Sequence, residues 1–332
     1  MDQAASLEPP PMFEKSLLYM DEFSKKHSGA KSNNLRNLRD KLDRSVNLPP
    51  SAVLPFQMAE YSLSLEPDVE RKLNSIIDKI TTVKSVKKMN KLLYQCKDLI
   101  LNLKFHADNS HHQFLRDNLI KFGIPANQFD QAWHTIKRVW ASKFNERAFL
   151  ATKKLGVKLN QIFMAVLVQR IIPAEYAYVI HTTNPTNAND DEVYVEACLG
   201  LGEALVSDMP GQALSFAYGK DDKKLSVNNY PNKPLKICSQ GFIFRSDSNS
   251  EDLPGFAGAG LFDSYTMNEE QRLRVSYNQE RLVINEGFRQ EFMNKVGWIG
   301  AHIEKIYDGE PQDIEGAFCQ GEYFVVQTRP QV

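Results

Sequence analysis

Four polar residues near the C-terminus have the types and the spacing to bind a metal–polyphosphate. They are Asp313, Glu315, Gln327 and Arg329. Carboxylate and amide oxygens suit a hard divalent cation, and an arginine guanidinium suits phosphate oxygens. The same residue types also occur on an ordinary terminal hairpin with one exposed salt bridge. The residues alone leave both interpretations open.

A β-hairpin over residues 312–332 is the element that must position these four side chains. Two strand-like runs flank the turn Gln320-Gly321, and side chains alternate between the faces of a strand. A two-residue turn pairs residues whose numbers sum to about 641, and a one-residue bulge raises the sum to about 642. In the bulged register Glu315 lies opposite Gln327, and the aspartate lies opposite the arginine. We therefore expect the four side chains to meet on one patch.

A second stretch with possible anion chemistry lies near the N-terminus. Residues 28–32 read Ser-Gly-Ala-Lys-Ser and precede a helix that we expect to start at Asn34. Small residues let backbone N–H groups approach an anion, Lys31 adds a mobile positive charge, and a helix N-terminus favours phosphate. The G-x4-G-K-[ST] spacing of a P-loop is absent. The alternative is an ordinary turn before a surface helix.

A third stretch combines an arginine with a glycine-rich run. Residues 237–244 predict a strand with Arg245 at its end, and hydroxyl residues follow. Three glycines then occur within six residues, at Gly255, Gly258 and Gly260. A flexible loop anchored by an arginine is suited to cover the phosphates of a nucleotide. The alternative is a long surface loop without a ligand.

The remaining periodicity predicts helices in the first half of the chain and strands in the second. Apolar residues repeat at three and four over residues 68–124, and Phe129–Lys154 is expected to form a further helix with Arg147 available to a site. The basic run Lys79–Lys91 is interpreted as a solvated helix face. After residue 161 the pattern changes to short strands, and a long helix over Gln279–Tyr307 leads into the hairpin.

Composition excludes several classes of protein. The 332 residues are 42% hydrophobic and 24% charged, as in a globular domain, and the net charge of −1 gives no bulk attraction to nucleic acid or membrane. No apolar run approaches the ~20 residues of a membrane span. The four scattered cysteines have no CxxC spacing, which favours reduced thiols in an intracellular compartment. The N-terminus shows neither a signal nor a transit peptide, so the expectation does not separate plastid from cytoplasm.

Taken together, the motifs resemble a family. The sequence from about Lys31 to Val332 is similar to the C-terminal nucleotide-binding region of α-glucan, water dikinases, which phosphorylate starch-like glucans. The matching segments are Gly29–Ser32, Trp140–Ala148, Gln169–Ile172, His181–Pro185, Gly200–Glu203, Arg245–Asp252, Gly258–Gly260, Gln312–Gly316 and Val326–Pro330. No single motif is specific, and the resemblance depends on their combination and order.

The resemblance implies an α+β fold of the ATP-grasp type, with mixed and antiparallel sheets and a helical segment. The same fold is implied for the related pyruvate phosphate dikinases and phosphoenolpyruvate synthases. We expect residues 1–57 to form an N-terminal ATP-grasp portion with a disordered lead over 1–12. Residues 58–155 are expected to form the helical segment, and residues 156–332 the core with the glycine loop and the hairpin.

The resemblance also implies the reaction and its partners. In glucan dikinases the β-phosphate of ATP passes to a histidine on a separate domain, the γ-phosphate passes to water, and the phosphohistidine then phosphorylates a glucan hydroxyl. ATP and Mg²⁺ are the implied cofactors. A phosphohistidine domain and an α-glucan are the implied partners.

Residue roles follow from the resemblance. Lys31 and Arg245 are expected to hold phosphates under the loop from Gly255 to Gly260, and Arg329 is expected to stabilise the transferring phosphoryl group. Glu315 and Gln327 would hold magnesium. The implied catalytic residues are Arg329, Arg245 and Lys31, and further residues implied in nucleotide binding are Gln169, Arg170, Ile171, Ile172, Thr182, Glu203, Gly258 and Gly260. The hairpin would form one wall of the phosphate site.

Two features depart from the family pattern. The acceptor histidine follows a serine in the family, and among the seven histidines only His111 does so, within a helical stretch. The chain alone is therefore expected to bind ATP without phosphorylating glucan. The wider superfamily has Arg-Ser-Ser where this chain has Arg-Ser followed by Asp247. The alternatives are another dikinase-like phosphotransferase and a non-catalytic relative acting as an interaction module.

Overall fold

The computed structural model describes residues 7–331 apart from 207–209, 239–240, 254–255, 258–259, 269 and 274. Contacts divide the chain into two units, each assembled from three separate segments. Unit 1 comprises residues 1–33, 51–169 and 241–267, and unit 2 comprises residues 34–50, 170–240 and 268–332. The division into the segments 1–57, 58–155 and 156–332 stays a prediction. The two units group residues by their contacts and therefore combine segments that are distant in the sequence.

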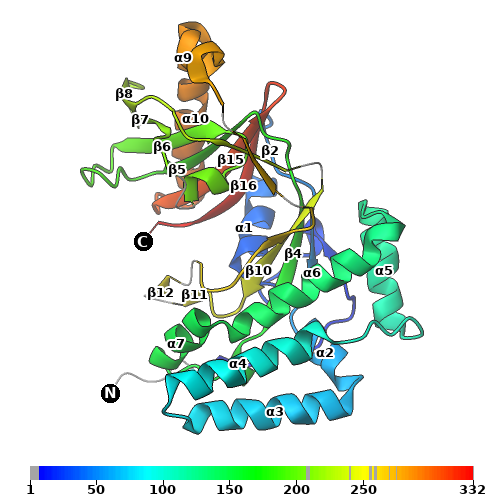
Figure 1. Cartoon of the computed structure of the whole chain (residues 1–332). Helices are drawn as coiled ribbons and strands as arrows, with labels where there is room; N and C mark the ends of the chain where they lie inside the picture. The colour runs from blue at the N-terminus through cyan, green and yellow to red at the C-terminus, as the bar shows by residue number, and fades with distance from the viewer. Residues whose placement is uncertain are drawn as a thin grey trace. The chain divides into compact units, whose positions relative to one another are not determined.

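Unit 1 is a five-stranded sheet covered by helices. The strand order is β1-β3-β4-β10-β13, with bounds Leu18–Tyr19, Ser51–Leu54, Met164–Arg170, Phe242–Ser248 and Tyr265–Thr266. The short strands β11 (Asp252–Leu253) and β12 (Phe256–Ala257) pair with each other. The helices are α2 (Met58–Ser64), α3 (Pro67–Thr82), α4 (Val86–Leu101), α5 (Ser110–Phe122), α6 (Phe129–Ala141) and α7 (Glu146–Lys154). All six lie within the expected helical segment 58–155, and α3 and α4 run side by side (Figure 1).

The core of unit 1 lies between one face of this sheet and the helices. Val166 and Val168 of β4 and Phe244 of β10 share one buried cluster with the α6 stripe that includes Ile136 and Trp140. Because strand side chains alternate, the intervening residues of β4 and β10 occupy the opposite sheet face. Those intervening residues carry the polar groups of interest in this unit.

Unit 2 is a seven-stranded sheet with one long helix against it. The order is β2-β16-β15-β5-β6-β7-β8, with bounds Val46–Asn47, Glu322–Pro330, Gln312–Cys319, Tyr176–His181, Glu192–Leu199, Leu214–Gly219 and Leu225–Asn229. The pair β16–β2 is parallel and the other pairs in this sheet are antiparallel. A second, two-stranded sheet joins β9 (Leu235–Cys238) to β14 (Glu270–Leu273). The α+β class with mixed and antiparallel sheets is therefore confirmed.

Helix α10 (Glu286–Ile306) packs across the large sheet of unit 2 (Figure 1). Phe292 and Val296 of the helix share a buried cluster with Tyr178 and Ile180 of β5 and Ile314 of β15. Residues that alternate with these strand positions point to the other face of the sheet. That face carries the polar side chains of the predicted site.

The hairpin has the predicted bulged register. Gln320 and Gly321 form the turn with φ of 51° and 83°, as expected for a two-residue hairpin turn. Gly316 pairs with Val325, so the numbers of the paired residues sum to 641 on the turn side. The register then shifts between Glu315 and Gly316. Beyond this bulge Glu315 lies opposite Gln327, and the pairing of Asp313 with Arg329 follows the same sum of 642.

Two predicted long helices are interrupted, which corrects the sequence interpretation. The expected helix Phe129–Lys154 ends at Ala141, continues as a 3-10 turn over Ser142–Phe144, and resumes as α7 after the extended residue Asn145. The Asn145 amide group donates to Asp263 and its side-chain oxygen accepts from Lys97, so the side chain is held outside the helix pattern. The expected helix Gln279–Tyr307 is likewise divided into α9 (Arg281–Ile284) and α10.

The cause of the second interruption is a helix cap. The Asn285 side chain accepts a hydrogen bond of 2.9 Å from the Phe288 backbone N–H at the start of α10. Asparagine is among the preferred N-cap residues because its oxygen satisfies a first-turn N–H group. Apolar periodicity alone continued through this position and missed the cap.

One predicted strand and one predicted helix start are also wrong. The expected strand over residues 237–244 is two strands, β9 and β10, which belong to different sheets, and Arg245 lies inside β10 rather than at its end. Helix α1 (Ala30–Arg39) begins four residues before Asn34. The continuation of β10 past Arg245 and the early start of α1 both involve buried polar contacts of Asp247, which are described below.

The basic run Lys79–Lys91 is expected to be exposed to solvent. Lys79, Lys84, Lys87, Lys88 and Lys91 are all exposed, which confirms that the basic run is solvated. The run is not a single helix face, because Lys79 lies on α3, Lys84 lies between the helices, and the other three lysines lie on α4. Within the part of the chain that the structure describes, no helix has the length and apolar character needed to cross a membrane.

Candidate functional site

A cavity of about 140 Å³ lies on the polar face of the unit 2 sheet. Strands β5, β6, β15 and β16 and the short helix α8 (Glu203–Val206) supply its walls. Its lining residues are Val179, His181, Glu196, Leu205, Val206, Asp313, Ile314, Glu315, Gln327 and Arg329. All four C-terminal residues selected from the sequence therefore line the same cavity.

Glu315 and Gln327 supply a donor set that fits magnesium. They are direct cross-strand partners, and Val179 of β5 lies opposite Glu315 on the other side. Among the described residues, no group of three or more His, Cys, Asp or Glu side chains is arranged to hold a metal ion. Mg²⁺ commonly uses one or two protein oxygens and completes its shell with water and substrate phosphate. The carboxylate–amide pair has the chemistry for that arrangement.

Asp313 links a histidine to the arginine of the cavity. One carboxylate oxygen lies 2.7 Å from His181 Nδ1, and the other lies 3.3 Å from Arg329 Nη2. When the carboxylate is ionised it only accepts hydrogen bonds, so His181 Nδ1 carries a proton in this contact. Arg329 keeps 41% of its side-chain surface exposed. Its guanidinium is thus oriented from one side and open to a ligand on another.

Glu196 is a cavity residue that the sequence analysis missed. It lies on β6 directly opposite Val179, and it lines the cavity together with Glu315. The alternation of β6 contained the signal, since Val193 and Val195 are buried and Glu196 points to the opposite face. Only the pairing of β6 with β5, which is not evident from sequence, brings this carboxylate to the site.

In unit 1, Asp247 holds the start of helix α1. Its carboxylate accepts hydrogen bonds of 3.0 Å from Gly29 N, 3.0 Å from Lys31 N and 3.3 Å from Ser32 N, and one of 2.5 Å from Ser32 Oγ. A Cβ at Gly29 would lie 2.4 Å from an Asp247 oxygen, so glycine is needed for this approach. Burial raises the pKa of the Asp247 carboxyl, and the Lys31 charge and these hydrogen bonds oppose that shift.

Lys31 and Arg245 both lie in unit 1. The Lys31 ammonium forms an ion pair with Glu251, whose side chain is 7% exposed. Arg245 is half-buried and, by strand alternation, shares the Asp247 face of β10. Lys31 therefore contacts an acidic residue of the segment 245–251 directly, and Arg245 belongs to that same segment.

The residues expected around adenine are placed as follows. Gln169 is fully buried, and its side-chain amide donates to Ser51 Oγ at 3.3 Å. It is the last residue of the segment 51–169 of unit 1. Arg170 starts the next segment of unit 2, and its backbone N–H donates to the Pro50 oxygen. Ile171 is buried and Ile172 is half-buried.

The second group of expected nucleotide residues has mixed placement. Thr182 is fully buried, and its hydroxyl accepts a 2.7 Å hydrogen bond from Gln312 N, so this side chain ties β5 to β15. Glu203 forms an ion pair with Lys236. Gly260 is exposed with φ of +73°. Gly255 and Gly258 lie outside the described residues.

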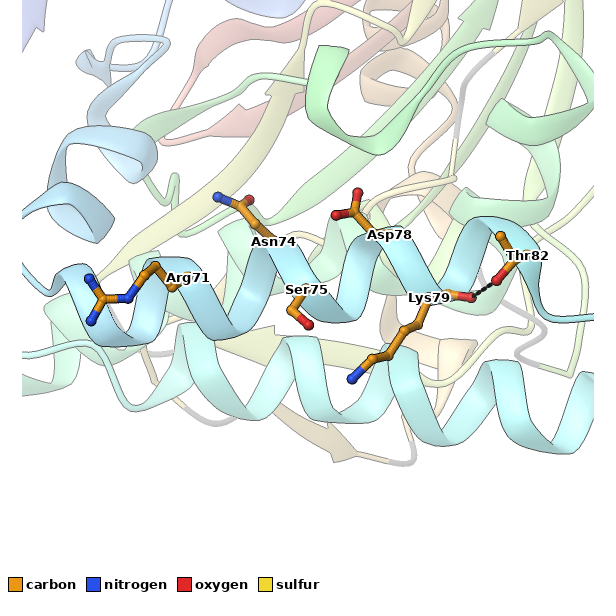
Figure 2. A pocket seen from close by; sticks show the side chains of 6 residues that line it. All are labelled: Arg71, Asn74, Ser75, Asp78, Lys79 and Thr82. Atoms are coloured by element: carbon orange, nitrogen blue, oxygen red, sulfur yellow. Dashed lines mark hydrogen bonds between the residues drawn. The ribbon is translucent and has the colours of Figure 1, made fainter.

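Two other hollows lack convergent chemistry. One of about 640 Å³ runs along α3 and is lined by Arg71, Asn74, Ser75, Asp78, Lys79 and Thr82. Figure 2 shows that all six come from one helix, and the hydrogen bond drawn there joins the Thr82 hydroxyl to the Lys79 backbone oxygen. The other contains Arg147, which does not act as a lone cation because it pairs with Asp263 and donates to the Leu261 oxygen.

The chain is similar to known dikinases and phosphoenolpyruvate synthases. The chain is 41% identical over 322 residues to the alpha-glucan water dikinase, chloroplastic, of Solanum tuberosum, and 38% identical over 320 residues to alpha-glucan water dikinase 2 of Arabidopsis thaliana. Each alignment covers 94% of this chain but only 21% and 24% of those relatives. A probable phosphoenolpyruvate synthase of Methanocaldococcus jannaschii is 25% identical over 195 residues, which is 59% of this chain and 14% of that protein.

The family model that matches is that of the pyruvate phosphate dikinase, AMP/ATP-binding domain, over residues 124–332. This range includes the glycine-rich stretch, every lining residue of the unit 2 cavity, and the complete hairpin. The chain therefore belongs to the pyruvate phosphate dikinase AMP/ATP-binding domain family.

Proposed function

We propose that this chain is the ATP-binding phosphotransfer domain of an α-glucan, water dikinase, with a fold of the ATP-grasp type. In this proposal the β-phosphate of ATP passes to a histidine on a separate domain, and the γ-phosphate is released to water. The phosphohistidine then phosphorylates a glucosyl hydroxyl of an α-glucan. The identity of 38–41% to glucan water dikinases over most of the chain supports this substrate class.

The main support for the proposal is that Glu315, Gln327 and Arg329 line one cavity. Glu315 and Gln327 lie directly opposite each other on β15 and β16, as shared binding of one cation requires. We assign the first two residues to magnesium, which neutralises phosphate charge when it is bound. We assign Arg329 to the oxygens of the transferring phosphoryl group, where its planar fork can donate two parallel hydrogen bonds. Phosphoryl transfer depends mainly on such positioning and charge neutralisation.

The remaining assigned residues, which include the implied catalytic residues Lys31 and Arg245, hold the nucleotide. Lys31 and Arg245 are assigned to phosphate oxygens, and the segment that ends at Gly260 is assigned to cover them. The backbone and side chains from Gln169 to Ile172 are assigned to adenine, with Thr182 and Glu203 in supporting contacts. A charge-assisted hydrogen bond from lysine or arginine to phosphate is roughly twice as strong as a neutral one, so the cations are expected to supply most of the affinity.

Calorimetric titration of this chain with Mg–ATP tests the proposal. We expect saturable binding that is lost or strongly weakened in the Glu315→Gln variant, because one magnesium oxygen loses its charge. The matched control is Asp78→Asn on the exposed face of α3, which should bind like the unaltered chain (Figure 2). Failure of the unaltered chain to bind Mg–ATP at millimolar nucleotide would refute the proposed function.

A further inference from the structure

Two carboxylates occupy both anion-binding features of the Gly29–Ser32 turn. The first feature is the set of backbone N–H groups at the start of α1, and the second is the Lys31 ammonium. Asp247 takes the first and Glu251 takes the second. Both carboxylates come from the short segment 245–251 of the same unit.

The backbone feature is not available to a ligand. Asp247 is fully buried and accepts from three backbone N–H groups and from the Ser32 hydroxyl. A phosphate cannot enter that position without expelling a buried carboxylate, which would then lose its three backbone N–H donors and the Ser32 hydroxyl. The turn therefore offers a phosphate the Lys31 side chain rather than the helix N-terminus.

The side-chain feature is occupied differently. Lys31 keeps 20% of its side-chain surface exposed, whereas Glu251 keeps 7%. The ammonium is thus the accessible half of a pair whose carboxylate is buried. Removing the cation partner of a buried carboxylate leaves an uncompensated buried charge, which is strongly unfavourable. A phosphate group approaching Lys31 must compete with this carboxylate.

We propose that Glu251 is an internal counter-ion that the nucleotide phosphate displaces from Lys31, and that this exchange sets the affinity for ATP. The inference rests on the proposed function, because it takes Lys31 as a phosphate-binding residue. If the ammonium is available in only a fraction of molecules, the apparent dissociation constant is raised by the reciprocal of that fraction. A lysine paired in 90–99% of molecules, for example, raises it by about ten- to a hundredfold.

A purely positioning role for Glu251 predicts the opposite result. If the carboxylate served to orient Lys31 toward the phosphate, its removal would weaken ATP binding. The sign of the change in affinity therefore separates the two roles. Burial of the pair does not by itself decide the sign, because it stabilises the closed pair in either case.

The experiment is calorimetric titration of Mg–ATP into the unaltered chain and into Glu251→Gln, which keeps the side-chain size and removes the charge. We expect the variant to bind at least about tenfold more tightly. In a Lys31→Met background the same substitution should change affinity less than twofold, because the competitor acts only through the ammonium. If Glu251→Gln melts below the assay temperature, Glu251→Asp replaces it, since a shortened side chain weakens the pair and should also tighten binding.

The matched control is Glu304→Gln. It removes the charge from a comparably buried pair in unit 2, since Lys220 and Glu304 keep 17% and 11% of their side-chain surfaces exposed. We expect no change in ATP affinity. Equal or weaker binding by the Glu251 variant would overturn the inference while leaving the proposed function intact, and so would an unchanged gain in the Lys31→Met background. Absence of ATP binding by every protein would refute the proposed function and this inference with it.

Discussion

The bulge that brings Glu315 opposite Gln327 lies next to a glycine that has no room for a side chain. A Cβ added at Gly316 would lie 2.1 Å from Tyr178 Cε2 and 2.6 Å from its hydroxyl oxygen. Contacts below 3.0 Å essentially do not occur for real Cβ atoms, so either the ring or the strand must move. Tyr178 is fully buried, and its hydroxyl donates to the Phe324 oxygen at 2.9 Å. The substitution Gly316→Ala therefore disturbs β5, β15 and β16 together.

The expected cost follows from these contacts. Overpacking a dense core costs about 1–3 kcal/mol, and loss of the Tyr178–Phe324 hydrogen bond adds about 1 kcal/mol. Alanine restricts the unfolded chain more than glycine does, which offsets about 0.4–1 kcal/mol of this loss in the free energy of unfolding. We expect Gly316→Ala to lower the free energy of unfolding by about 2–3 kcal/mol. Because the register shift lies between Glu315 and Gly316, Mg–ATP binding should weaken as well.

Urea denaturation of the unaltered chain and the variant measures this cost, and calorimetry measures the loss of binding. The control Gly287→Ala lies in the first turn of α10, where a Cβ meets only ordinary contacts at 3.6 Å, and it should leave stability unchanged or slightly raised. In a double-mutant cycle, Tyr178→Ala should relieve much of the Gly316→Ala cost. A denaturation midpoint for Gly316→Ala equal to that of the unaltered chain would show that Tyr178 does not impose the glycine.

Two further predictions concern the arginine of the cavity and a buried histidine. Arg329→Lys should change stability by less than about 1 kcal/mol, because its pair with Asp313 is partly exposed, yet it should weaken Mg–ATP binding in calorimetry; unchanged affinity would remove Arg329 from the phosphate site. Burial lowers the pKa of His112 to about 4, and its Nδ1 accepts from His106 N, so stability present above pH ~6.5 should fall by up to about 1.4 kcal/mol per pH unit down to about pH 4. Denaturation across this range should show a shallower fall for His112→Gln, and parallel curves would contradict the assignment.

The hairpin was predictable because its constraints are local. Turn length and a single bulge fix which residues are opposite, and alternation fixes which of them share a face. The sequence therefore limits the hairpin to two registers, and the bulge observed between Glu315 and Gly316 selects the one in which Glu315 lies opposite Gln327. What could not be predicted is the third strand. Glu196 reaches the cavity because β6 pairs with β5 and β5 pairs in turn with β15, which is distant in the sequence, and that long-range pairing leaves no short-range signal.

The wrong helix predictions have a different origin. Apolar periodicity continues through both Asn145 and Asn285, but each asparagine uses its side chain to satisfy polar groups at a break in the helix. Asparagine is tolerated inside a helix and favoured at its N-terminus, so periodicity alone cannot decide between the two. Asn285 could have been recognised as a cap, whereas the partners of Asn145 are distant in sequence.

Strand β10 shows why polar sequence is a poor guide to loop structure at a buried site. Ser246, Asp247 and Ser248 suggest a loop after Arg245, yet all three are buried inside the strand. The strand can continue because Asp247 finds its donors at the Gly29–Ser32 turn, more than 200 residues earlier in the chain. The same contact explains the early start of α1, since the carboxylate satisfies first-turn N–H groups that an adjacent cap residue would otherwise serve. A single long-range pairing thus fixes the end of one strand, the start of one helix and the backbone of Lys31, and the side chain of that lysine is then the part of the turn left to exchange Glu251 for a ligand.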